Sequence, residues 1–62
     1  MRRLTKLREE RKRSRLTQEE LARAAQINRV SLARLETGEA RAKPETQAKL
    51  AKVLKVKPDA LV

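Results

Sequence analysis

The chain has 62 residues, enough for one small domain, and its 17 basic and eight acidic residues give it a net charge of +9. It contains no cysteine, no histidine and no aromatic residue, which excludes disulfides, thiolate metal sites and the commonest general base. The positive charge indicates an anionic partner, and the lack of any apolar run long enough for a signal peptide or a membrane span leads us to expect a cytoplasmic protein without a membrane partner.

Residues 1–15 are the most basic part of the chain, with eight basic and two acidic residues. We expect residues 1–3 to be a frayed arm. Good helix formers over residues 4–14 predict a first helix, with Leu4, Leu7 and Arg11 on one face. So few apolar residues predict that this helix is docked by few contacts.

A second helix is predicted to begin at Gln18. Thr17 followed three positions later by Glu20 is a capping box, in which each side chain accepts a hydrogen bond from a backbone N–H that the helix leaves free. Leu16 before the cap and Leu21 inside the helix form a hydrophobic staple across it.

A third helix begins directly afterwards, with Asn28 as its N-cap and Ile27 and Leu32 as its staple. Gly38 suits the left-handed position just beyond its end. Two capped helices joined by three or four residues must cross steeply, so residues 18–37 are predicted to form a helix-turn-helix corner.

The outward face of this third helix is unusual in its chemistry. Each residue turns about 100° around the axis, so the leucines point inward. The outward arc combines two arginines with small or apolar residues and no acid: Arg29, Val30, Ala33, Arg34 and Thr37. Such a face suits a DNA major groove, where arginine bonds guanine and an apolar tip touches a thymine methyl group. An ordinary solvated helix face is the alternative interpretation.

After Gly38 comes a loop with two basic residues, Arg41 and Lys43, and Pro44 then suits the first position of a fourth helix. Pro58 is predicted to open a fifth, short helix. The apolar ending of the chain, residues 60–62, either closes the core or forms a dimer surface, and the candidate residues are Ala60, Leu61 and Val62.

The charge is distributed unevenly around the corner. Residues 16–40 have a balance of −1, whereas residues 1–15 have +6 and residues 41–62 have +4. This distribution is typical of a DNA reader whose nearly neutral corner meets the bases while basic flanks, among them Arg41 and Lys43, contact phosphates.

Four stretches of the chain together resemble the phage repressor and Cro-type (XRE-like) helix-turn-helix family. They are Thr17-Gln18-Glu19-Glu20-Leu21-Ala22, Ile27-Asn28, Ser31-Leu32-x-x-Leu35-Glu36-x-Gly38 and Leu50-Ala51-x-x-Leu54-x-Val56. The resemblance implies a compact all-α domain of five helices over residues 1–62, with the third helix in the major groove.

The resemblance also implies roles for individual residues. The base-contacting positions of the family fall on Arg29, Val30 and Arg34, with Ala33 beside them. Its phosphate-contacting positions fall on Gln18 and Ser31. Arg11 and Glu36 match a structural ion pair of the family.

This chain departs from the family pattern at three places where glycine is usual, namely Arg15, Gln26 and Lys55. A residue with a Cβ costs roughly 1 kcal/mol in a left-handed conformation, although replacing glycine also lowers the entropy of the unfolded chain. Gln26 in the corner is therefore the residue most able to change its geometry.

The leading hypothesis is a sequence-specific regulator that binds double-stranded DNA as a homodimer and represses transcription by occupying its operator. The alternative is a protein-binding module of the same fold, such as an antitoxin or a bridging factor. An enzyme is not expected, because the adjacent acids of the helices point about 100° apart and cannot converge on one reacting atom. We likewise expect no cofactor, no metal and no small-molecule substrate.

Overall fold

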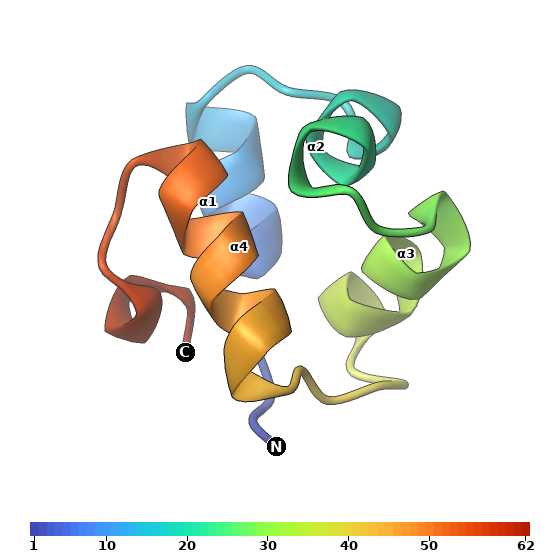
Figure 1. Cartoon of the computed structure of the whole chain (residues 1–62), viewed down its shortest axis with the longest axis vertical. Helices are drawn as coiled ribbons and strands as arrows, with labels where there is room; N and C mark the ends of the chain where they lie inside the picture. Colours follow the sequence, from blue (N-terminus) through green and yellow to red (C-terminus); the bar gives the residue numbers. More distant parts are fainter.

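The computed structural model describes residues 1–62, which fold as helices joined by short loops (Figure 1). Its elements are α1 (Leu7–Arg13), α2 (Gln18–Ala25), α3 (Arg29–Thr37), α4 (Pro44–Leu54) and a 3₁₀ helix, η1 (Pro58–Leu61). In Figure 1, α2 and α3 lie on one side of α4, and η1 lies on the other. No helix is both long and apolar enough to cross a membrane.

The starts of α2 and α3 are held by the predicted caps. The Thr17 hydroxyl accepts a bond from the Glu20 N–H (3.0 Å), and the Glu20 carboxylate accepts one from the Thr17 N–H (2.9 Å). The Asn28 side chain accepts a bond from the Val30 N–H (2.7 Å). Both N-terminal predictions are therefore confirmed, and each cap satisfies donors that the first helical turn leaves free.

Three helix ends adopt the left-handed conformation without glycine. The φ angles are 58° at Arg15, 57° at Gln26 and 59° at Lys55, as expected at these departures from the family pattern. In each case the next residue donates its N–H to a carbonyl five residues earlier, as Ile27 does to Ala22 (2.9 Å). These bonds close Schellman-type ends and offset the strain of the left-handed residue.

The core is made of leucine and alanine. Its largest fully buried side chains come from every part of the chain: Leu4, Leu7, Leu21, Leu32, Leu50 and Leu61. Leu4 and Leu7 are both 1% exposed or less, so the N-terminal segment is firmly docked by these two residues. Leu61 closes the core, while Ala60 and Val62 beside it remain half-buried.

Two predictions about the ends of the chain are wrong. The domain has four α-helices instead of five, because the last element is one 3₁₀ turn whose bonds span three residues, from Ala60 to Lys57 and from Val62 to Asp59. The first α-helix begins at Leu7 and not at Leu4, because the Lys6 N–H donates to the Leu61 carbonyl (2.9 Å), which ties this segment to η1.

The expected frayed arm is also wrong. Arg2 forms an isolated antiparallel bridge with Ala42, in which each backbone N–H donates to the other residue's carbonyl, at 3.0 and 2.8 Å. The Arg2 guanidinium further meets the Asp59 carboxylate at 3.3 Å. The N-terminal segment therefore contacts both the α3–α4 loop and η1.

Candidate nucleic-acid interface

The exposed side of α3 is the first part of the candidate interface. Arg29 and Arg34 are exposed, and Val30 is 57% exposed, although it is a large apolar residue. Ala33 is half-buried, so it presents only a small surface between its neighbours. The Asn28 cap holds the first turn of this helix, which carries Arg29 and Val30. The helix therefore offers two guanidinium groups around a small apolar surface.

A buried ion pair fixes the position of α3 relative to α1. The Glu36 carboxylate, 2% exposed, accepts bonds from Nε of Arg11 (2.6 Å) and from its Nη2 (3.3 Å). The Arg11 guanidinium also donates to the Leu16 carbonyl (2.8 Å) in the α1–α2 loop. The predicted Arg11–Glu36 pair is thus confirmed, and it joins the end of α1 to the last turn of α3.

Gln18 joins the same cluster from the start of α2. Its amide nitrogen donates to the Glu36 carboxylate at 3.0 Å, and its side chain is half-buried. An amide nitrogen carries two N–H groups, so one remains free for an external acceptor. Gln18 therefore has one N–H group left with which it could bind a phosphate.

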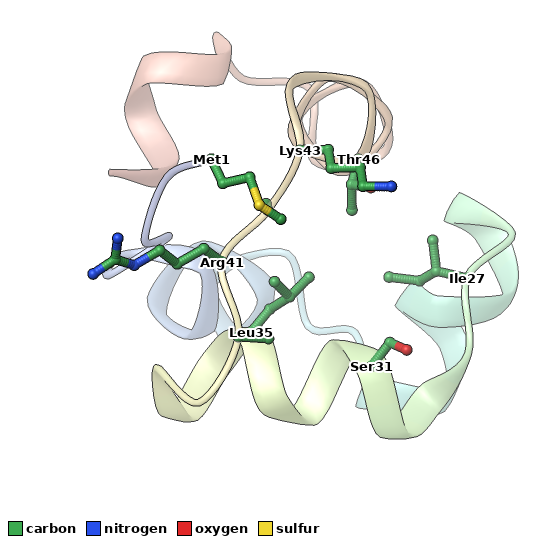
Figure 2. A pocket seen from close by; sticks show the side chains of 9 residues that line it. Met1, Ile27, Ser31, Leu35, Arg41, Lys43 and Thr46 are labelled. Carbon is green, nitrogen blue, oxygen red and sulfur yellow. The ribbon is translucent and has the colours of Figure 1, made fainter.

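The other three residues predicted to contact phosphates gather around one hollow of about 310 Å³ (Figure 2). Ser31 borders it from α3, and Arg41 and Lys43 border it from the α3–α4 loop, while Ile27 and Leu35 supply apolar lining. Figure 2 shows the Arg41 and Lys43 side chains extending in opposite directions from this loop. Gln18 is not part of this hollow, so the structure divides the predicted phosphate contacts into two groups.

The acidic residues of the corner are already engaged. Glu19 pairs with Arg23 at 3.1 Å on the surface of α2, and Glu36 pairs with Arg11. Hydrogen bonds from the backbone and side chain of Thr17 hold the pKa of Glu20 below its ordinary value, so this carboxylate stays ionised at neutral pH. By contrast, four exposed cations of α3 and the following loop form no ion pair: Arg29, Arg34, Arg41 and Lys43. Their donors are free to bind anions or base edges.

Two contacts of this region were not predicted from the sequence. One is the bond from Gln18 to Glu36, and the other is the bridge between Arg2 and Ala42. The spacing of Gln18 and Glu36 on their two helices could have suggested the first contact once the corner was predicted. The second consists of backbone bonds, which any residue except proline can form, so no residue type signals it.

Comparisons with known proteins agree with this geometry. A family model described as a helix-turn-helix domain matches residues 4–62. A solved structure that the chain resembles is the restriction-modification controller protein C.AhdI from Aeromonas hydrophila, with 31% sequence identity and a TM-score of 0.88. That alignment covers 94% of this chain and 88% of the controller protein. No curated protein sequence matches the chain.

Proposed function

The chain belongs to the helix-turn-helix family, and from this premise we propose that it is a transcription regulator that binds specific sequences of double-stranded DNA. Its Cro-type character is supported by the sequence motifs and by the similarity to a controller protein. The observation that carries the proposal is the exposed face of α3, where two unpaired arginines flank Val30 on a helix held by a buried ion pair. Free guanidinium donors beside an apolar tip, on a helix whose position is fixed, suit the edges of bases in the major groove.

Base recognition is assigned to α3 in the major groove. Arg29 and Arg34 donate to guanine O6 and N7, because a guanidinium can bond both atoms of one base edge. Val30 contacts a thymine methyl group, and the small side chain of Ala33 lets the helix approach the bases closely. Each specific arginine contact is worth about 1–3 kcal/mol of discrimination.

Backbone recognition is assigned to residues on either side of this helix. Ser31, Arg41 and Lys43 border the hollow beside the α3–α4 loop and bind phosphates, with Arg41 and Lys43 reaching them on opposite sides of the loop. Gln18 uses its remaining N–H on a phosphate from the start of α2. These contacts supply affinity that does not depend on sequence, because every nucleotide carries the same charge.

We further infer that the protein acts as a homodimer and represses transcription by occupying its operator. Two copies of so small a reader on a near-palindromic site would place α3 in successive major grooves, about 10 bp apart. The half-buried Ala60 and Val62 are candidates for the dimer surface, whereas Leu61 belongs to the core. Sedimentation with and without operator DNA tests this assembly, and a monomer at high concentration in both conditions would exclude it.

Selection of bound duplexes from a random-sequence DNA library tests the function directly. The proposal predicts enrichment of a motif with two inverted half-sites about 10 bp apart. A protein-binding module of the same fold would enrich no motif. The selection also yields the operator sequence with which variants can be compared.

Two alanine variants then separate the proposed roles. Arg34→Ala should cost about 1–3 kcal/mol on the selected site and relax preference at one base pair. Lys43→Ala should weaken all duplexes about equally and lower the slope of log K against log salt by about 1. Lys57→Ala is the control for removal of one positive charge, because Lys57 is exposed and directly precedes η1. In Figure 1, η1 lies on the other side of α4 from α3. Equal losses on selected and random DNA for Arg34→Ala would overturn the base-reading assignment.

A further inference from the structure

The N-terminal segment is joined through its backbone to the loop that carries two of the proposed phosphate contacts. The Arg2 N–H donates to the Ala42 carbonyl at 3.0 Å, and the Ala42 N–H donates to the Arg2 carbonyl at 2.8 Å. Ala42 lies between Arg41 and Lys43 and is 2% exposed, whereas both of its neighbours are exposed. The bridge therefore holds the backbone of Ala42 in place, and with it the adjoining backbone of Arg41 and Lys43.

Apart from the burial of the Ala42 side chain in the core, the α3–α4 loop has few other restraints on its backbone. Its residue Ala40 donates to the Arg34 carbonyl at 3.1 Å, which fixes the first half of the loop to α3. The Lys43 carbonyl accepts the N–H of Gln47 at 2.9 Å, which fixes the other end to α4. Between these points only the bridge to Arg2 supplies backbone bonds. Loss of the bridge would leave buried polar groups of Ala42 unpaired, so the loop would have to move them toward water.

The side chain of Arg2 contributes much less than its backbone. Its ion pair with Asp59 joins side chains that are 59% and 87% exposed, and such surface pairs have little effect on stability. We call the N-terminal segment that carries the bridge, residues 1–3, the strap. If the strap works through its backbone, its effect must therefore persist when the Arg2 charge is removed. It must weaken when the Arg2 N–H is removed, because one of the two bonds of the bridge is then lost and the buried Ala42 carbonyl has no partner.

We propose that the backbone of Arg2 is a positioning element for DNA binding, which holds Ala42 so that Arg41 and Lys43 reach phosphates together. The inference rests on the proposed DNA-binding function. Arg2 itself touches no phosphate in this role. The segment acts through the loop, and its loss therefore reduces the number of phosphates neutralised without changing the face of α3.

The test compares Arg2→Pro with Arg2→Ala. Both variants lose the guanidinium, but only proline lacks the N–H that donates to Ala42. Arg3→Pro and Arg3→Ala form the matched control pair, because the Arg3 N–H makes no backbone hydrogen bond. Affinity for a mixed-sequence duplex is measured by fluorescence anisotropy at about 50 and 200 mM salt, a range over which phosphate contacts change affinity strongly. Affinities are expressed per folded protein from far-UV circular dichroism.

If the strap positions the loop, only Arg2→Pro should lose affinity for the duplex relative to its alanine counterpart, and this loss should depend on salt concentration. For each phosphate that the variant no longer neutralises, the affinity ratio of Arg2→Ala to Arg2→Pro should become about three- to four-fold larger at the lower salt concentration. In an Arg41→Ala/Lys43→Ala background the same proline should have no further effect. Arg3→Pro should bind like Arg3→Ala.

The outcomes of this experiment distinguish the two proposals. If the unsubstituted protein binds the duplex but Arg2→Pro matches Arg2→Ala at both salt concentrations, the strap is refuted while DNA binding stands. A proline effect that persists in the double-alanine background also refutes it, since the segment would then act elsewhere. If the unsubstituted protein binds no duplex and enriches no motif, the proposed function itself fails.

Discussion

Replacing Glu36 by glutamine should destabilise the domain far more than the same change at an exposed residue of the surface, because its carboxylate is buried. The carboxylate is 2% exposed, and its two oxygens accept all three bonds that Arg11 and Gln18 donate to it. A glutamine of the same shape offers one acceptor oxygen and turns an N–H₂ group toward donors. The charge of Arg11, whose side chain is 12% exposed, then lacks its counter-ion.

The expected size follows from this burial. Hydrogen bonds to charged groups contribute about 1.5–3 kcal/mol, and breaking a buried ion pair costs about 3–5 kcal/mol. Arg11 keeps its bond to the Leu16 carbonyl, so we expect the lower part of this range, about 3 kcal/mol. A chain of this length has a free energy of unfolding of roughly 3–9 kcal/mol. The substitution should therefore remove a third or more of the stability.

Urea unfolding followed by circular dichroism is the suitable assay, because the chain has no tryptophan or tyrosine to report by fluorescence. Glu39→Gln is the control, since it makes the same change of charge at an exposed residue without an ion pair. It should lie within about 0.5 kcal/mol of the unsubstituted protein. If Glu36→Gln lies within the same margin of this control, the pair is solvated and the reasoning fails.

Gln26→Gly should stabilise the protein by less than about 1 kcal/mol, because relief of the left-handed strain outweighs the added entropy of the unfolded chain. A clear loss of stability measured in urea would contradict this. Gly38→Ala should cost about 1 kcal/mol through its φ of 87° alone, since nothing lies within 4 Å of the added Cβ. Because the pKa of Glu20 is lowered in the folded protein, its contribution to stability is present above about pH 4.5 and is lost as the pH falls through the lowered value. Thr17→Ala should cost about 1 kcal/mol at neutral pH through loss of the hydroxyl that caps α2. Glu20→Gln should flatten the acid-dependent loss in urea titrations, because it removes the ionisable group while the Thr17 N–H remains; an unchanged pH profile would exclude Glu20 as its source.

The corner was predictable from sequence because its signals are local. The bonds of a capping box join Thr17 and Glu20 within one helical turn, so the residue types alone specify them. The left-handed residue at Gln26 was expected from the family resemblance, because glycine is usual at this position. The arc of Arg29, Val30 and Arg34 followed from the helical period, and all three are exposed on α3.

Only the tertiary structure determined the features that depend on backbone hydrogen bonds between distant parts of the chain. Lys6 donates to Leu61 instead of continuing a helix from Leu4, and η1 takes bonds over three residues because it forms only a single turn. The bridge between Arg2 and Ala42 links residues forty positions apart through groups that every non-proline residue carries. The sequence by itself thus determined α3 and its exposed face, because the caps and the helical period depend on side-chain types close together in the chain. The docking of the termini depended on which backbone groups the packed leucines brought together.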